Sequence, residues 1–230
     1  MPAIASSARN SRPTRAPRKG AVRRSNEARI LRAAECVFAR AGFAGARVAA
    51  IAALAGVPKA NLHYYFKSKR DLYRAVLDNI LRLWLSETDA IRKDADPRAA
   101  LDSYLRAKMR FSRLYPEASR VFANEIIHGA PEIGKYLRTE LKALVDEKSA
   151  VFEHWIAQGR LAPLDPRHLF FAIWAVTQTY ADFTAQIQAV LGVRAVTDAA
   201  FAAATEQVVG LILRGCGFEP APPPCPDRSA

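Results

Sequence analysis

Hydrophobic residues recur every three to four positions along almost the whole chain, as they do on one face of a helix. Two segments show the pattern clearly. In the first the apolar positions are Ile30, Ala33, Ala34, Val37, Phe38 and Ala41, and in the second they are Leu72, Val76, Leu77, Ile80, Leu83 and Trp84. The sequence has no alternating segments bounded by Asn-Gly or Asp-Gly turns, which would indicate hairpins. The pattern predicts an all-α protein of roughly nine or ten helices.

Glycine and proline mark where these helices end. We expect a helix over residues 26–41 that stops at Gly42, a short helix over 48–55 that stops at Gly56, and a third over 58–65. Pro58 suits the first position of the third helix, where its missing N–H loses no partner. Two short helices joined by a turn that contains Gly form a helix-turn-helix.

A fourth helix is predicted from Lys69 through Trp84. Ser68 and Asp71 have the spacing of a capping box, which opens a helix. The N–H groups at such a helix start attract phosphate, and Lys69 adds a full positive charge. Arg47, just before the second helix, is placed to do the same.

Basic charge is concentrated in the first third of the chain. Residues 1–24 contain seven basic and no acidic side chains, residues 25–74 nine and three, and residues 75–230 eighteen and nineteen. One end therefore carries the net charge of +12 and should meet a polyanion such as DNA, RNA or an anionic membrane. We expect a basic disordered tail over 1–24, a helix-turn-helix domain over 25–74, a larger, nearly neutral helical domain over 75–217 and a proline-rich tail over 218–230.

The outward residues of the third helix suit duplex DNA, because the second helix of a helix-turn-helix enters the major groove. Lys59 and Asn61 are candidates for base contacts, and Ala60 is small enough to lie against a thymine methyl. The candidates for phosphate contacts are Arg47, Lys59, His63, Tyr64, Tyr65 and Lys69. Tyr64 and Tyr65 could instead pack in the small helical core. A protein that binds a membrane surface is the alternative of a different class, but it leaves the helix-turn-helix spacing unexplained.

These residues resemble a known family. The run IAALAGV over residues 51–57, followed by NLHYYFKSK over 61–69, is similar to the N-terminal domain of TetR-family repressors. The resemblance implies an all-α dimer whose three-helix head binds operator DNA and whose larger C-terminal domain binds a small ligand. The family's DNA contacts fall here on Arg47, Lys59, Ala60, His63, Tyr64, Tyr65 and Lys69. Many members have Ser in place of Pro58, so a phosphate contact by that hydroxyl is lost.

A candidate ligand site lies in the segment 169–191. Trp174, Thr177, Gln178 and Ala181 follow the spacing of one helical face. An aromatic plane, a hydroxyl and an amide together suit a flat polar heterocycle. The spacing alone agrees better with a simpler interpretation, in which Trp174 belongs to the core and Gln178 is an amide bonded between helices.

A second resemblance favours the ligand site. The strings YPEASRVF (115–122), LKALVDEKSAVFEHW (141–155) and GRLAPLDPRHLFFAIWAVTQTYADF (159–183) are similar to regulators of pyrimidine utilisation within the same family, which sense uracil and thymine. The resemblance implies a site formed by Trp84, Trp174, Thr177 and Gln178, with Tyr180 and Asp182 nearby. Asn124 stands where we expect an apolar residue, so a different effector is the alternative.

The last helix carries small residues suited to close packing. They are Ala199, Ala200, Ala203 and Ala204, accompanied by Phe201, Val208, Leu211 and Ile212. With the preceding helix they predict a four-helix interface across a two-fold axis, and a core role within one subunit is the alternative. A dimer would also set the two reading helices about one DNA turn apart, roughly 34–36 Å.

Neither an enzyme nor a secreted protein is indicated. The histidines are dispersed, no Gly-x-Ser-x-Gly or glycine-rich nucleotide motif occurs, and the Glu-x-x-His at residues 125–128 has no second copy to complete a di-iron site. We therefore expect no cofactor and no metal. Three dispersed cysteines and an N-terminus without an apolar signal point to the cytoplasm. The longest apolar run, residues 169–176, is too short to cross a bilayer.

Overall fold

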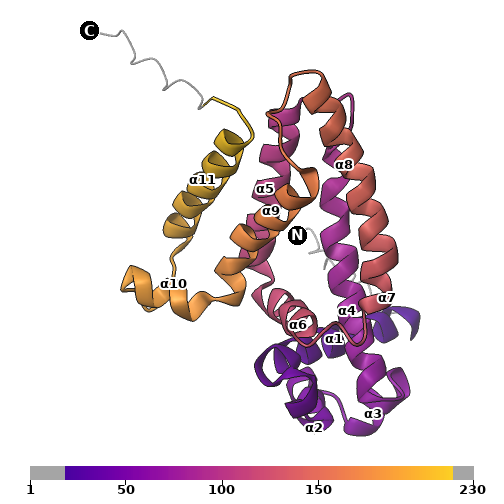
Figure 1. The fold of residues 1–230 in the computed structure, drawn as a ribbon. Helices are drawn as coiled ribbons and strands as arrows, with labels where there is room; N and C mark the ends of the chain where they lie inside the picture. The colour runs from indigo at the N-terminus through magenta and orange to yellow at the C-terminus, as the bar shows by residue number, and fades with distance from the viewer. Residues whose placement is uncertain (1–18, 220–230) are drawn as a thin grey trace, which may run out of the picture.

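The computed structural model describes residues 19–219, and these contain helices and turns but no strand (Figure 1). The segments are α1 (Lys19–Gly45), α2 (Val48–Ala55), α3 (Lys59–Tyr65), α4 (Lys69–Leu85), η1 (Ser86–Ala90), α5 (Pro97–Leu114), α6 (Pro116–Ile127), α7 (Gly134–Tyr136), η2 (Leu137–Leu141), α8 (Lys142–Ala157), α9 (Pro166–Asp182), α10 (Thr184–Leu191) and α11 (Asp198–Gly215). The all-α prediction is confirmed. Within the described range, no helix combines the length and hydropathy needed to span a bilayer.

The short helices of the head closely follow the predicted boundaries. α2 covers residues 48–55 as expected, and Gly56 ends it in the left-handed region with φ 63° and ψ 38°. α3 starts one residue later than expected, because Pro58 has ψ 143° and is its N-cap. Ser68 accepts from the Asp71 N–H over 3.1 Å, so the predicted capping box does begin α4.

α1 is longer than the sequence pattern indicated. It begins at Lys19 and runs to Gly45, with a kink at Gly42, where φ is 63° and ψ 176°. Residues 19–24, which we expected in the disordered tail, are therefore helical. The rest of that tail, residues 1–18, and most of the expected proline-rich tail, residues 220–230, lie outside the described residues.

The core of the head continues into the body. Ile30, Phe38, Ile51 and Leu62 are buried together, and the same cluster includes Val121 from α6. α1 packs against α2, α4 and α6, so the head is joined to the body along a broad seam. α1 therefore contacts both α6 of the body and α2, against which α3 packs.

The body is built around α5, α8 and α9, with α11 packed against α5 (Figure 1). Its core contains Phe152, Trp155, Phe170 and Ile173, all at most 2 % exposed. Asp96 caps α5 by accepting from the Ala99 N–H over 2.8 Å, and Asp165 caps α9 by accepting from the Arg167 N–H over 2.8 Å. The following prolines occupy the first turns of both helices, as the sequence indicated.

Candidate nucleic-acid interface and ligand cavity

The turn between α2 and α3 is held from α1 by Arg29. Its Nη2 donates to the carbonyl of Ala55 over 2.6 Å and to that of Gly56 over 3.3 Å. These are carbonyls at the end of α2, where intrahelical donors are lacking. A Cβ at position 56 would lie 2.8 Å from the same Nη2, in addition to the strain of a positive φ. The angle between the two short helices therefore depends on Arg29 and Gly56 together.

α3 presents nearly all of its side chains to solvent. Leu62 is 1 % exposed and anchors the helix to the core, whereas Tyr64 is 74 % exposed. The remaining exposed positions at this surface are Arg47, Pro58, Lys59, Ala60, Asn61 and His63. These predicted DNA-contact positions are thus open to solvent, and α2 and α3 form the lower end of the molecule in Figure 1.

The two tyrosines of α3 behave differently. Tyr64 points outward, but Tyr65 is half-buried, packs against the head core and accepts a hydrogen bond from Asn26 Nδ2 over 3.4 Å. The rings contact each other edge to face, with centroids 5.4 Å apart. The core alternative left open by the sequence therefore describes Tyr65 better than Tyr64.

Lys69 does not extend freely towards solvent as we expected. Its ammonium donates to the carbonyls of Ala44 and Ala46 over 3.2 and 3.1 Å and lies 4.7 Å from the Phe43 ring centroid. These contacts join the start of α4 to the end of α1. Lys69 braces the head in this structure, and a phosphate contact requires its ammonium to leave these carbonyls.

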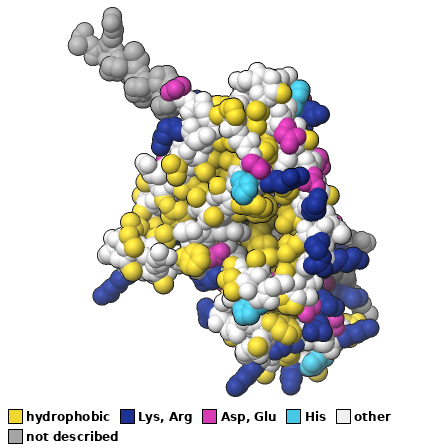
Figure 2. All heavy atoms as spheres, in the orientation of Figure 1, with side chains coloured by type: hydrophobic (Ala, Val, Ile, Leu, Met, Phe, Trp, Pro, Cys, Tyr) yellow, Lys and Arg dark blue, Asp and Glu magenta, His cyan; other side chains and the backbone are white. Residues whose placement is uncertain are grey.

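One basic element beside α3 was missed at the sequence level. The guanidinium of Arg23, on α1, lies 6.0 Å from the centroid of the Tyr64 ring, and Arg23 and Arg24 are both exposed. Lys and Arg side chains project from the lower end of the molecule in Figure 2. The helical start of α1 therefore extends the basic surface alongside the reading helix. The basic composition of residues 1–24 was visible in the sequence, but their helical continuation was not.

A cavity of about 450 Å³ lies in the body among α4, α5, α6, α8 and α9. Hydrophobic side chains gather at the centre of the face drawn in Figure 2, between the helices that enclose it. Most of the lining is apolar: Leu81, Trp84, Tyr104, Phe122, Ala123, Ile126, Ile127, Leu137, Leu141, Leu144, Val145, Phe170, Trp174 and Phe183. Its polar members are Thr88, Lys108, Tyr136, Lys148, Gln178 and Asp182.

The side chains that α9 presents to the cavity are Phe170, Trp174, Gln178 and Asp182, each one helical turn from the next. Thr177 is fully buried and does not line the cavity; its hydroxyl donates to the Ile173 carbonyl over 2.7 Å. Tyr180 packs edge to face on Phe201, with centroids 5.6 Å apart, and is likewise outside the lining. Of the residues predicted for the ligand site, Trp84, Trp174 and Gln178 line the cavity, whereas Thr177 and Tyr180 do not. Asp182, which was expected nearby, also lines it.

Trp174 combines a structural contact with its place in the cavity. Its Nε1 donates to the Tyr104 hydroxyl over 3.1 Å, and burial raises the pKa of Tyr104 to about 12. Trp84 meets the Phe122 ring edge to face, with centroids 4.7 Å apart. Asn124, the expected departure from the pyrimidine regulators, is not among the lining residues.

Two charged side chains of the cavity were not singled out as ligand contacts by the sequence analysis. Lys108 is 5 % exposed, and its ammonium lies 4.5 Å from the Trp84 ring centroid. Burial lowers the pKa of Lys108 to about 8, against a smaller upward effect of Asp182. Burial also raises the pKa of Asp182, whose Oδ1 has no hydrogen-bond partner among the described residues. The available signal was a lysine within the otherwise apolar stripe that includes Leu101, Tyr104 and Leu105 of α5.

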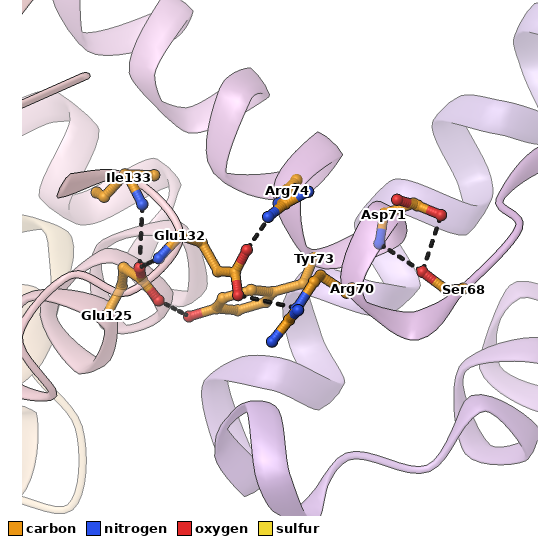
Figure 3. A network of polar contacts seen from close by, with 8 residues as sticks. All are labelled: Ser68, Arg70, Asp71, Tyr73, Arg74, Glu125, Glu132 and Ile133. Atoms are coloured by element: carbon orange, nitrogen blue, oxygen red, sulfur yellow. Dashed lines mark hydrogen bonds and ion pairs between the residues drawn. The ribbon is translucent and has the colours of Figure 1, made fainter. Parts of the chain in front are cut away.

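A polar network connects the start of α4 to the segment that follows α6 (Figure 3). Tyr73 donates to Glu125 Oε2 over 3.0 Å, and Glu125 Oε1 accepts from the N–H groups of Glu132 and Ile133 over 2.6 and 3.3 Å. The Glu132 carboxylate pairs with Arg70 and Arg74 of α4 at 3.1 and 2.6 Å. Glu125 thus serves this junction, and residues 19–219 contain no group of three or more side chains arranged to hold a metal ion.

Comparisons with known proteins agree with this arrangement. Residues 30–76 match the family of bacterial regulatory proteins, tetR family, and residues 77–219 match the YcdC-like protein, C-terminal region. The chain is 49 % identical over 186 residues to the HTH-type transcriptional regulator RutR of Escherichia coli, covering 81 % of this chain and 88 % of that protein.

The chain belongs to the TetR family. A more distant relative is the HTH-type transcriptional repressor NicS of Pseudomonas putida, which is 32 % identical over 57 % of this chain and 61 % of its own. A putative transcriptional regulator from Streptomyces coelicolor has a TM-score of 0.63 and 27 % identity, covering 83 % of this chain and 97 % of its own. The structure of AibR with isovaleryl coenzyme A and operator DNA has a TM-score of 0.65 at 18 % identity, covering 81 % and 97 %, and shares the fold.

Membership of the TetR family decides the class of protein. TetR-family regulators are dimers that bind operator DNA and small-molecule ligands, and they are not enzymes. This chain is a RutR-like TetR regulator, a DNA-binding transcription regulator with a helix-turn-helix head.

Proposed function

We propose that this TetR regulator is a cytoplasmic repressor that releases its operator when a pyrimidine base, such as uracil or thymine, binds the cavity. The observation that carries the proposal is the meeting of Trp84, Trp174 and Gln178 in one largely apolar cavity of about 450 Å³. This size is typical of small-molecule sites. Indole rings stack on a flat base, and a primary amide pairs with a ring N–H and C=O.

On the DNA side, we propose that α3 lies in the major groove with Pro58 at its start. Lys59 and Asn61 then face base edges and Ala60 approaches a thymine methyl. Phosphates are contacted by Arg47, His63, Tyr64 and Tyr65, which flank these positions, and by Lys69 if it is released from α1. The exposure of Lys59, Asn61 and Tyr64 supports this assignment.

We propose that the homodimer forms through the outer faces of α9 and α11. The residues predicted to form the interface on the last helix do not all lie on the surface. Phe201, Val208 and Ile212 are buried within the chain, whereas Leu211 is 58 % exposed. Ala199, Ala200 and Ala203 are also exposed. On α9, Phe171 is 52 % exposed. Apolar and small side chains on these two faces suit close helix packing across a two-fold axis.

The coupling between ligand and DNA runs through α4 and α6 in this proposal. α4 begins beside α1, at Lys69, and reaches the cavity at Trp84. α6 supports the head core through Val121 and contributes Phe122 and Ile126 to the cavity. A ligand that binds one separation of the two heads better than the other shifts the population between them, and 1–3 kcal/mol is a typical coupling.

A gel-shift titration tests the function directly. Genomic fragments selected by the protein are bound, and uracil, thymine and unrelated heterocycles of similar size are added in turn. Release by uracil or thymine alone supports the proposal. Release only by a different class of small molecule would support the alternative effector and leave the DNA-binding assignment intact. Complete competition between operator DNA and anionic vesicles would instead favour the membrane-surface alternative.

A further inference from the structure

Two opposite charges face the same cavity without pairing. Lys108 and Asp182 are close enough to affect each other electrostatically, yet no ion pair forms within 4.0 Å. The Lys108 ammonium is buried, has no hydrogen-bond acceptor among the described residues and contacts the Trp84 ring. The Asp182 carboxylate is partly buried and lies near Ser119 and the Arg120 guanidinium, but its Oδ1 is left without a partner in the described part of the chain. A buried ammonium with no acceptor and a carboxylate oxygen with no donor are both costly in an apolar cavity, so their retention points to a ligand.

The positions of these residues relative to the aromatic walls restrict that ligand. Asp182 lies one turn beyond Gln178 and two turns beyond Trp174 on α9, so the three define a row along one wall. Lys108 approaches from α5 and lies at the Trp84 ring. A flat ring held between these walls can present one edge to both a donor and an acceptor, because Lys108 and Asp182 are near enough to affect each other.

The chemistry of the two groups is complementary and fixed. A charged ammonium only donates hydrogen bonds, and an ionised carboxylate only accepts them. We propose that Lys108 and Asp182 read adjacent C=O and N–H groups on one edge of a cyclic imide or lactam, and that this pair decides which rings bind. The carbonyl accepts from Lys108, and the ring N–H donates to Asp182. This inference rests on the proposed function, in which a flat heterocycle occupies this cavity.

The selectivity that follows is stronger than shape alone provides. A site built to hydrogen-bond a ligand N–H rejects an analogue without it by large factors, because the buried acceptor is left unpaired. A ring with its carbonyls intact but its N–H groups methylated therefore loses the Asp182 contact and keeps the Lys108 contact. Uracil and 1,3-dimethyluracil differ in this way.

Calorimetric titration of the full-length protein with these two probes tests the pairing. We expect wild type to prefer uracil over 1,3-dimethyluracil by about 100-fold or more. Asp182→Leu should reduce this preference to below about tenfold, because only the N–H contact is removed. Lys108→Met should weaken both probes by about tenfold or more and leave the preference unchanged, because both carry the carbonyl. Thr177→Val, on the same helix but outside the lining, is the matched control and should bind like wild type.

Milder variants guard against loss of folding. Lys108→Gln retains a donor and Asp182→Asn retains an acceptor, so each should bind uracil more tightly than the corresponding apolar variant. A preference for uracil that survives Asp182→Leu, or is absent from the wild type, overturns the pairing while the pyrimidine function stands. If wild type binds no pyrimidine, the proposed function fails, and hydantoin and glutarimide become the probes. Binding of either that is lost in Asp182→Leu supports the inference, and binding of neither overturns it.

Discussion

Tyr73 on α4 donates a hydrogen bond to Glu125 on α6, with 3.0 Å between Oη and Oε2. Burial and the adjacent carboxylate raise the pKa of Tyr73, so the phenol stays protonated and remains the donor. Glu125 is also bonded to the backbone of Glu132 and Ile133, just before Tyr136 of the cavity wall. This bond thus links the helix that leaves the head to the segment that leads into the cavity wall.

Tyr73→Phe should reduce the effect of uracil on operator affinity. It should change the affinity for operator alone, and the affinity for uracil alone, much less. Removing the phenol deletes one hydrogen bond to a carboxylate, which costs about 1–3 kcal/mol of stability. We expect the uracil-induced loss of operator affinity to shrink by about fivefold or more, measured by fluorescence anisotropy with and without uracil. Tyr180→Phe, whose ring packs on Phe201 away from the network, is the control. An unchanged response in Tyr73→Phe would show that this bond carries no coupling.

Lys108→Met should stabilise the ligand-free protein although it weakens ligand binding. The pKa of Lys108 is lowered to about 8 from 10.5, so folding at neutral pH carries the cost of a buried charge, about 3 kcal/mol. Urea denaturation at pH 7 should show the gain in free energy of unfolding. For wild type, stability should rise between about pH 8 and pH 10.5, where the unfolded chain holds more protons at this site, and Lys108→Met should lack that rise. A destabilised Lys108→Met would indicate a structural role.

Effector binding should also lose about 1–2 kcal/mol of favourable free energy as pH rises through about 8 and Lys108 loses its charge. The other titratable groups at the cavity are Asp182, Lys148, Tyr104 and Tyr136. Burial raises the pKa values of both tyrosines, so they stay neutral in this range, and burial also raises the pKa of Asp182 against the opposing effects of Ser119, Arg120 and Lys108. Calorimetry at pH 7 and pH 9 provides the comparison. Equal affinities at the two pH values would argue against a charged Lys108 as the donor.

Gln178→Leu and Thr177→Val should differ clearly in their affinity for uracil, although the two residues are adjacent in the sequence. Gln178 lines the cavity, so its loss should weaken uracil binding by about tenfold, the value of one good hydrogen bond in a buried site. Thr177 is buried on the other side, where its hydroxyl bonds to its own helix, so the nearly isosteric Val should leave the affinity within about twofold. If calorimetric titration showed a larger loss of affinity for Thr177→Val than for Gln178→Leu, Thr177 rather than Gln178 would face the ligand.

Lys59→Ala should reduce binding to operator DNA more than binding to random duplex. Lys59 is exposed on α3 and has no structural contact to lose, so the fold should be unaffected. Loss of a base contact typically costs about 1–3 kcal/mol against the cognate site. Fluorescence anisotropy on both duplexes at one salt concentration gives the ratio of the affinity for operator to the affinity for random DNA. Equal losses on the two duplexes would reassign Lys59 to phosphate.

The start of α1 should contribute charge without sequence preference. Replacing Arg23 and Arg24 by Ala should lower the slope of log K against log salt by about 0.9 for each arginine that contacts a phosphate, equally for operator and random DNA. Arg92→Ala with Lys93→Ala removes the same charge from exposed positions in the body and should leave the slope unchanged. If both double variants behave alike, the effect is one of net charge only.

The sequence alone was sufficient for most of the head. Apart from the start of α1, the helix ends in the head are set by local chemistry: a left-handed glycine after α2, a proline before α3 and a serine cap before α4. The exposed face of α3 was also predictable, because a seven-residue helix with one buried leucine has little choice of orientation. The positions of Lys69 and Tyr65 were less predictable, because the acceptors and donors they meet come from α1, far away in the chain.

The cavity depended on the tertiary structure. Periodicity shows which side chains share a face of α9, but this helix packs against α5, α6 and α8, and spacing does not say which of these neighbours leaves a gap. For this reason Thr177, which was expected in the site, does not line the cavity, whereas Asp182, which was expected only nearby, does. The amino-acid sequence by itself determined the helical class, the reading head and the aromatic content of a ligand site, since these follow from local pattern and composition. The packing of distant helices decided which charges face the ligand, because burial and electrostatic contact arise only when separate segments meet.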